Sequence, residues 1–454
     1  MKRVVRRRVK KTPLAKTVPD TILNNPEIGS AISSLPPAYS FEIHKTIHRL
    51  LTAKSKFCAL QMPEGLLMYG CVISDIIKRF TSVTAVVLLG DVTYGACCVD
   101  DLGAEALGCD FLVHYGHSCL VPMTCTVLPT LYVFVEIAID VTHAIKCMRE
   151  TVPEKSKINI MGTVQFSAAV QQAKQVRSEA RRASSGSEAR RASEGIARSA
   201  PAIQSAPLLG LCMCVTQPNL SNVISPTLTV FFLQDLSALG YDCVVPQAKP
   251  LSAGEVLGCT SPKNLFDNSL DATNQCMLFL ADGRFHLEAA MIANPDLKAY
   301  RYDPYSRTLT EEGYDFKLMK DNRYKAIVDA QGAKTFGVIL GTLGRQGNPA
   351  ILSKIKALLT KHGKRCFIVL LSEIMPGKLD MMPDADAWVQ IACPRLSVDW
   401  GHFFAKSVLS PYEVHVALGE AEWKKDEYPM NFYAKDDTDW SNFGADNSLR
   451  DLII

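Results

Sequence analysis

The sequence has almost no excess of charge, because 49 basic and 46 acidic residues leave a net charge of +3. No overall field would attract nucleic acid, so we expect no direct nucleic-acid partner. The sequence also has no uninterrupted apolar run long enough to span a bilayer, and we predict no membrane segment. It lacks an apolar signal segment near the N-terminus, and we therefore expect its 15 cysteines to be reduced thiols in the cytoplasm.

Common functional motifs are missing as well. No two cysteines are separated by two residues, the spacing typical of zinc-finger and redox pairs. The loop after the first predicted strand has no GxGxxG pattern, which disfavours a nucleotide-binding oxidoreductase. The glycine-rich stretch at 341–347 reads GTLGRQG and lacks the GK[ST] of a P-loop. The site must therefore use a less common arrangement of residues.

What the sequence does contain is a repeated alternation of apolar strand-length runs and helical stretches. The predicted strands fall into three sets: 57–63, 85–91, 111–116 and 131–139; then 158–166, 242–247, 276–283 and 299–304; then 335–341, 366–372 and 387–392. These runs are continuously apolar, as is typical of strands buried on both faces. The sequence predicts an α/β fold of three similar units with parallel sheets, arranged around a central site.

This pattern divides the chain into domains. We predict a basic tail over 1–35, a first α/β domain over 36–150, a second over 151–330 and a third over 331–454. The second domain is interrupted at about 175–226 by a Ser-, Ala- and Arg-rich stretch in which SEARRAS occurs twice. Burying this stretch would leave many charges without partners, so we predict a disordered insertion. Its cysteines, Cys212 and Cys214, are interpreted as incidental.

One cysteine occupies a loop-like position late in each unit: Cys97, Cys259 and Cys393. Ligands of open α/β sheets gather at the carboxyl ends of strands, so three packed units could bring these loops together. Three thiolates on one iron–sulfur cluster would leave one iron open to a substrate. The alternatives are scattered cysteines that behave as small hydrophobes, or a metal-binding scaffold in which three cysteines and a histidine hold zinc.

Long sequence blocks resemble one family. They include QMPEGLL at 61–67, GDVTYGACCVDDLGAEALGCDFLVHYGHSC at 90–119, PLSAGEVLGCTSP at 250–262, DGRFHLEAAMIANP at 282–295 and VQIACPRLSVDWG at 389–401. Apart from the insertion, residues 36–434 resemble the eukaryotic diphthamide biosynthesis protein 1 family, also called 2-(3-amino-3-carboxypropyl)histidine synthase subunit 1. All three cysteine loops lie within the resemblance.

The resemblance implies a non-classical radical transferase with S-adenosylmethionine as co-substrate. It implies that Cys97, Cys259 and Cys393 hold a [4Fe–4S] cluster, with Cys98 as the alternative first ligand. The reaction would begin diphthamide synthesis by moving a 3-amino-3-carboxypropyl group to a histidine of elongation factor 2. The implied partners are elongation factor 2, a homologous second subunit in a heterodimer, and an electron-donor protein.

Three further residues are candidates for binding the cofactor. Arg284 directly follows a predicted strand and is suited to pair with the carboxylate of the aminocarboxypropyl group. His286 lies two residues on and could help to orient the substrate, and Arg345 lies in the glycine-rich stretch. Tyr94, His114 and His117 flank the first cysteine loop as possible supporting groups. No residue is assigned a catalytic role.

Overall fold

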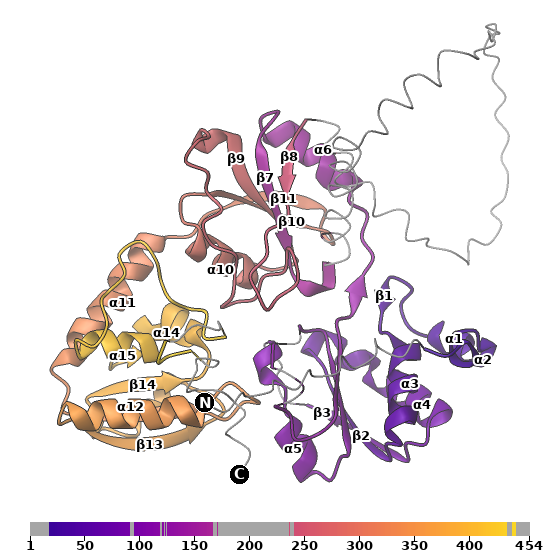
Figure 1. Ribbon diagram of the computed structural model, residues 1–454, viewed down its shortest axis with the longest axis horizontal. Coiled ribbons are helices and arrows are strands. Elements are labelled where there is room, and N and C mark those ends of the chain that lie inside the picture. The colour runs from indigo at the N-terminus through magenta and orange to yellow at the C-terminus, as the bar shows by residue number, and fades with distance from the viewer. Residues whose placement is uncertain are drawn as a thin grey trace, which may run out of the picture.

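The computed structural model describes residues 18–90, 95–118, 120, 121, 123, 125–166, 170, 236, 240–433 and 438–441. Three α/β units, each built on its own sheet, form three lobes of a triangle (Figure 1). The predicted insertion at about 175–226, the basic segment before residue 18 and Tyr94 lie outside the described residues. The α/β fold with several parallel sheets is confirmed.

The first unit is built, over its described residues, on four parallel strands in the order β3-β2-β4-β5. The strands are β2 (Phe57–Gln61), β3 (Ala85–Leu89), β4 (Phe111–Tyr115) and β5 (Thr130–Val133). Its helices are α1 (Asp20–Leu23), α2 (Pro26–Ile32), α3 (Ile43–Ala53), η1 (Glu64–Tyr69), α4 (Gly70–Phe80), η2 (Ala96–Cys98) and α5 (Asp101–Ala106).

The second unit has the strand order β11-β10-β9-β7-β8 in the described part of the chain. The strands are β7 (Lys157–Gly162), β8 (Asp242–Val244), β9 (Gln275–Leu280), β10 (Lys298–Asp303) and β11 (Thr308–Glu312). Its helices are α6 (Thr142–Thr151), η3 (Val164–Phe166), η6 (Ala272–Asn274) and α10 (Phe285–Ala293).

The third unit has the strand order β13-β12-β14-β15, again parallel throughout its described strands. The strands are β12 (Thr335–Gly341), β13 (Arg365–Leu371), β14 (Ala387–Ile391) and β15 (Val408–Leu409). Its helices are α11 (Phe316–Gln331), α12 (Pro349–Lys361), α13 (Pro376–Asp380), α14 (Pro394–Trp400), η7 (Gly401–Phe403) and α15 (Pro411–Ala417).

The three units share one strand order, in which the first strand lies between the second and the third. The chain therefore leaves the first and third strands in opposite directions along the sheet, which opens a crevice at their carboxyl ends. In the third unit this crevice lies between β12 and β14, where the GTLGRQG stretch and Cys393 follow the two strands. The topology thus directs these two loops to the same end of one sheet.

Two strand predictions were wrong in detail. The run at 131–139 is not one strand, because Val135 has a φ of 45° and separates β5 from β6 (Glu136–Ile137). β6 instead pairs antiparallel with β1 (Tyr39–Ser40). The second sheet is also not purely parallel, because β11 pairs antiparallel with β10. The polar sequence TLTEE gave no apolar signal for that edge strand.

Part of the predicted N-terminal tail is folded. The side chain of Asn25 accepts hydrogen bonds from two backbone N–H groups of α2, and Pro26 occupies the first helical position. Ile28 and Leu35 are buried in the core of the first unit. Residues 20–35 therefore belong structurally to the first unit, although the sequence here has few apolar residues.

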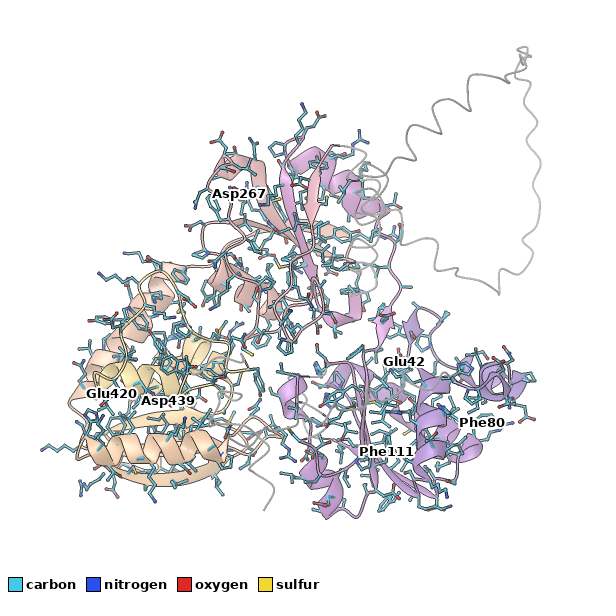
Figure 2. All side chains as sticks on the ribbon, viewed as in Figure 1. Glu42, Phe80, Phe111, Asp267, Glu420 and Asp439 are labelled. Atoms are coloured by element: carbon cyan, nitrogen blue, oxygen red, sulfur yellow. The ribbon has the colours of Figure 1, made fainter. Side chains whose placement is uncertain are left out.

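Each sheet has an apolar core on both of its faces, and side chains fill the space between sheets and helices (Figure 2). This arrangement explains the continuous apolar runs, because alternate residues of one strand enter opposite cores. In β12, for example, Val338 packs on the α12 side and Ile339 on the other. Among the described helices, none is long and apolar enough to cross a membrane.

Candidate functional site

Cys97 and Cys98 lie together in the short helix η2, in the loop that follows β3. Gln61, at the end of the neighbouring β2, fixes the backbone of this loop. Its Nε2 donates to the carbonyl oxygen of Cys98 at 2.8 Å, and its Oε1 accepts from the N–H of Asp100 at 3.0 Å. Cys98 is buried, whereas Cys97 is partly exposed. The two sulfurs therefore have different access from a loop held in one conformation.

A loop of the third unit packs directly on this pair. Gly344 has a φ of +56°, and a Cβ there would lie 2.4 Å from the backbone of Cys98, so only glycine fits. The N–H of Arg345 donates to the carbonyl oxygen of Cys97 at 2.9 Å. The Arg345 guanidinium forms a bidentate ion pair with the Asp101 carboxylate, donating from Nε at 2.8 Å and from Nη2 at 2.7 Å. This ion pair raises the pKa of Arg345.

Cys259 lies in the long loop between β8 and β9, where the backbone N–H of Leu257 bonds the carbonyl oxygen of Thr260 at 2.9 Å. The hydroxyl of Thr260 donates to Asn431 at 3.0 Å and also lies 3.7 Å from the Cys259 sulfur. The loop of the second unit is thus tied to the C-terminal segment that follows the third unit.

Cys393 directly follows β14 and is the N-cap residue of α14. Gln390 fixes its backbone by donating from Nε2 to the Cys393 carbonyl oxygen at 3.0 Å. Cys97 and Cys259 follow the second strand of their units, whereas Cys393 follows a third strand. The three cysteines therefore do not occupy equivalent positions, although each lies beyond a carboxyl end.

The cysteines of the three units lie close enough to influence one another's ionisation. A hydrogen bond with Cys98 raises the pKa of Cys97 well above its ordinary value, and burial, Cys393 and Cys259 raise it further. Burial raises the pKa of Cys393 to about 12, with Cys259 and Cys98 adding to the effect. Burial also raises the pKa of Cys259, against the opposing influence of Thr260 and Arg395. Without a bound cation, these thiols resist ionisation.

Tyr433 lies in the same place. Its side chain is buried, and burial together with Cys97, Cys259, Cys98 and Cys393 raises its pKa well above the ordinary value. It packs in a small apolar cluster with Leu120, Leu251 and Leu257, which Cys97 and Cys259 also contact. Apolar side chains therefore pack against Cys97 and Cys259 on one side.

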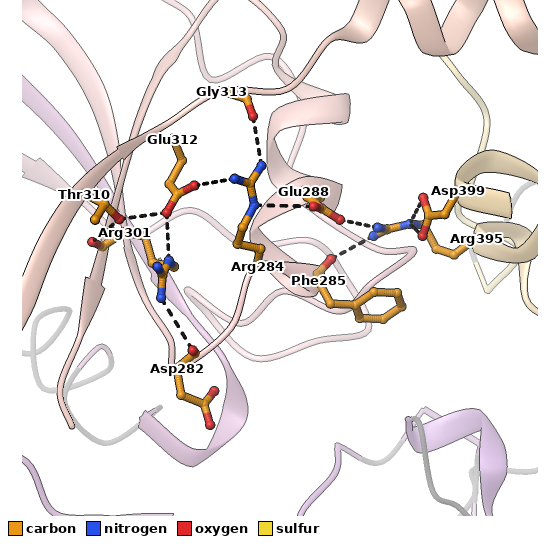
Figure 3. A network of polar contacts seen from close by, with 10 residues as sticks. All are labelled: Asp282, Arg284, Phe285, Glu288, Arg301, Thr310, Glu312, Gly313, Arg395 and Asp399. Atoms are coloured by element: carbon orange, nitrogen blue, oxygen red, sulfur yellow. Dashed lines mark hydrogen bonds and ion pairs between the residues drawn. The ribbon is translucent and has the colours of Figure 1, made fainter. Parts of the chain in front are cut away.

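Arg395 links Cys393 to the second unit. Its guanidinium is 3% exposed and pairs with Glu288 and Asp399, as Figure 3 shows. It also donates to the carbonyl oxygens of Phe285 at 2.7 Å and Gly258 at 3.3 Å. Burial alone would lower the pKa of Arg395, but the two carboxylates outweigh it and raise the pKa. A permanent positive charge is thus held next to two of the cysteine loops.

Arg284 belongs to the same network but carries bonds of its own (Figure 3). It pairs with Glu312 at 2.9 Å and Glu288 at 3.5 Å, and it donates to the carbonyl oxygen of Gly313 at 3.0 Å. Its side chain is 47% exposed. The guanidinium is therefore engaged with carboxylates of its own unit, and its contact with a substrate carboxylate stays a prediction.

Histidines gather between the first and second units. Burial lowers the pKa of His286 to about 4, and the nearby His117 and Arg395 contribute. Burial and His117 lower the pKa of His114 to about 3. Because Gln61 Oε1 already accepts from Asp100, His114 must donate from Nδ1, 2.9 Å away, and its Nε2 is left as a buried acceptor. The imidazoles of His114 and His286 are therefore neutral at physiological pH.

Comparison with known proteins identifies the family. The family model described as "Putative diphthamide synthesis protein" matches residues 62–221 and 227–429. The protein called 2-(3-amino-3-carboxypropyl)histidine synthase subunit 1 of Homo sapiens is 45% identical over 423 residues, which are 93% of this chain and 81% of the relative. The protein of that name from Gallus gallus is 47% identical over 92% of this chain and 86% of its own length.

The chain belongs to the diphthamide synthesis protein family. A protein of the same name from Dictyostelium discoideum is 44% identical over 94% of this chain and 78% of its own length. Among solved structures, Dph2 from Pyrococcus horikoshii with a 4Fe-4S cluster matches with a TM-score of 0.59 at 23% identity. The match covers 86% of this chain and 94% of that chain, and shows that the fold is shared.

In this member of the diphthamide synthesis family, the donor set fits an iron–sulfur cluster. Soft thiolates are the ligands such clusters prefer, and here they come from three units, with the Arg395 cation nearby. The zinc alternative makes a different demand on the geometry and stays a prediction. Zinc–sulfur bonds of about 2.3 Å would need all ligands crowded around one point. Within the described ranges, no three His, Cys, Asp or Glu side chains are grouped closely enough to bind one metal ion directly.

Sequence reasoning missed four residues beside the cysteines: Asp101, Gln346, Arg395 and Tyr433. Asp101 gave no signal in the sequence, because its partner Arg345 is 244 positions away. Arg395, in ACPRL, carried a local signal, because it is a basic residue two positions after a cysteine at the end of a predicted strand. Gln346 and Tyr433 carried none, since the cysteines near them are distant in the sequence and no local pattern links them.

Proposed function

We propose that this chain catalyses the first step of diphthamide biosynthesis. It would transfer the 3-amino-3-carboxypropyl group of S-adenosylmethionine to a histidine of elongation factor 2. The observation that carries the proposal is that Cys97, Cys259 and Cys393, from three units, lie close enough to affect one another's pKa. The name shared by the relatives, 2-(3-amino-3-carboxypropyl)histidine synthase subunit 1, supports the same reaction.

The three cysteines hold a [4Fe–4S] cluster in this proposal, and one iron remains without a protein ligand. When bound, the cluster supplies the single electron that cleaves the sulfonium bond to the aminocarboxypropyl arm. Cys97 is preferred as the first ligand, because it shares partial exposure with Cys259 and Cys393. Cys98 is the alternative, because its sulfur also influences Cys393. The crystallised Dph2 with a 4Fe-4S cluster supports an iron–sulfur cofactor.

The released aminocarboxypropyl radical would add to the imidazole C2 carbon of the target histidine. The adduct would then lose the C2 proton and return one electron to the oxidised cluster, and methylthioadenosine would be the other product. The chain's own residues must orient the sulfonium substrate and exclude water. His286 is suited to orientation, because it is neutral and lies near Arg395. Arg284 would have to exchange Glu288 or Glu312 for the substrate carboxylate. Arg345 holds the backbone of Cys97 and pairs with Asp101, and its contact with the cofactor stays a prediction.

The proposal includes three partners: elongation factor 2, an electron-donor protein and a homologous second subunit. Because translation factors act in the cytoplasm, we infer that this chain works there too. The edge strand β13 is the surface we assign to the second subunit. Its outer edge pairs with no described strand, and Ile368 and Leu370 are 45% and 62% exposed. An unpaired apolar edge strand favours association with another chain.

Anaerobic reconstitution tests the function. The chain is combined with the second subunit, elongation factor 2, S-adenosylmethionine and a reductant, and transfer to histidine is followed by mass spectrometry. The proposal predicts a mass increase on one histidine and stoichiometric methylthioadenosine. A chain that carries zinc without iron and sulfide, and that supports no transfer, would overturn it.

A further inference from the structure

Gln346 lies directly over the first cysteine pair. Its Nε2 is 3.4 Å from the sulfur of Cys98 and 3.7 Å from the sulfur of Cys97. The side chain is 8% exposed. It comes from the third unit, whereas both sulfurs belong to the first, so the contact exists only because the two units pack together.

The amide group can serve both sulfurs at once. A glutamine amide carries two N–H donors on one nitrogen, one for each neighbouring acceptor. Thiolates carry no hydrogen and can only accept, so the amide must present its nitrogen rather than its oxygen to them. The contact with Cys97 or Cys98 is therefore kept whichever of the two holds the iron.

The backbone leaves this side chain little freedom. Gly344 packs against the Cys98 backbone, and the Arg345 N–H is bonded to the Cys97 carbonyl oxygen. Two residues after Gln346, the side chain of Asn348 accepts from the N–H groups of Ala350 and Ile351 and begins α12. Gln346 is thus fixed between two anchored points, and its donor is positioned before any cluster binds.

We propose that Gln346 raises the reduction potential of the cluster by donating an N–H group to each sulfur of the Cys97–Cys98 pair. The inference rests on the proposed function, and it adds a residue that sets how readily the site accepts its electron. Reduction adds negative charge to the cluster and its thiolates. Hydrogen-bond donors to the sulfurs therefore stabilise the reduced form more than the oxidised form. Gln346 is a positioning and tuning residue, because its amide contacts the cysteine pair that supplies the first ligand.

The test compares reduction potentials of the full-length chain, measured anaerobically by spectroscopic redox titration. Gln346→Met removes both donors at similar size, and Gln346→Glu also adds a negative charge. At a fixed ambient potential, we expect the ratio of reduced to oxidised cluster to fall about tenfold in Gln346→Met, which corresponds to about 59 mV for one electron. In Gln346→Glu, the ratio of reduced to oxidised cluster should fall further, because the added negative charge disfavours reduction.

Gln275→Leu is the matched control. Gln275 is also buried, and its amide donates to the carbonyl oxygens of Asp267 at 3.0 Å and Leu270 at 3.3 Å. Asp267 lies on the outer side of the second unit, away from the other two units (Figure 2). This variant should lose stability but keep the wild-type potential.

Equal potentials in wild type and both Gln346 variants would overturn the inference while leaving the proposed function intact. If both Gln346 variants lost the cluster while Gln275→Leu kept it, the amide would be needed for assembly, and tuning would be refuted. A wild-type chain without iron and sulfide would overturn the proposed function, and this inference with it. Iron and sulfide analysis of the wild type thus separates the two failures.

Discussion

Arg345 of the third unit and Asp101 of the first unit form a bidentate ion pair. The Asp101 side chain is fully buried, and that of Arg345 is 14% exposed. Both residues lie beside the first cysteine loop. Asp101 follows Cys98 by three residues in the sequence, and the backbone N–H of Arg345 donates to the carbonyl oxygen of Cys97. The contact that joins two units is therefore also the contact that positions the first cysteine pair.

Replacing Arg345 should cost both stability and cluster binding. Arg345→Ala leaves the Asp101 carboxylate buried without its cation, although Asp101 keeps a bond from the Val127 N–H. We expect the free energy of unfolding to fall by roughly 3 kcal/mol in urea titrations. Lys361→Ala, which breaks an exposed pair with Glu420, should lower the free energy of unfolding far less. Equal losses in the two variants would contradict the anchoring role of Arg345.

Steady-state kinetics can show whether Arg284 binds the substrate or only holds neighbouring carboxylates in place. If it binds the carboxylate of S-adenosylmethionine, Arg284→Met should raise the KM for that substrate roughly tenfold or more, because a charged hydrogen bond is lost. Arg301→Met is the control, since Arg301 pairs with the same Glu312 at 2.9 Å. A similar rise in KM for both variants would mean that Arg284 acts only by holding Glu312.

His114 should make the protein acid-sensitive. Its folded pKa is about 3 and its ordinary value is 6.5, so the unfolded chain binds more protons between these values. Stability is therefore lost as the pH falls from about 6.5 towards 3, by about 2 kcal/mol at pH 5. Urea unfolding of the cluster-free protein at pH 7 and pH 5 measures this difference. His114→Asn should reduce it, and an unchanged pH dependence would exclude His114 as the cause.

The exposed edge of the third unit should be required for association with the second subunit. Leu370→Glu introduces a charge on β13 and should weaken heterodimer formation at least tenfold in a pull-down or calorimetric titration. The control is Leu107→Glu, which changes a leucine of similar exposure, 55%, in the first unit. This variant should form the heterodimer as well as the wild type does. Undiminished binding by Leu370→Glu would place the interface elsewhere.

Local sequence predicted most of the α/β pattern because buried parallel strands are continuously apolar. Such runs do not show where a backbone turns, so the break at Val135 was missed. A polar edge strand such as β11 has one solvent-facing side and lacks the apolar signal. The shared strand order is a property of pairing between strands, and no single run reveals it.

The site was only partly predictable for a similar physical reason. A cysteine after an apolar run can be located in the sequence, and the three candidates lie close enough to affect one another's pKa, while their binding of a cluster stays a prediction. The residues that set their surroundings come from other units, such as Gln346, which is 249 positions from Cys97. The pairing of Arg345 with Asp101 likewise depends on how the first and third units pack. Such contacts carry no local periodicity or motif.

The most direct test of the account is the iron and sulfide content of single Cys→Ala variants at positions 97, 98, 259 and 393, purified anaerobically. We predict that Cys97→Ala, Cys259→Ala and Cys393→Ala each lose the cluster and aminocarboxypropyl transfer, and that Cys98→Ala keeps both. If Cys98→Ala lost the cluster and Cys97→Ala kept it, Cys98 rather than Cys97 would be the first ligand. An intact cluster and full transfer in all four variants would contradict the central claim.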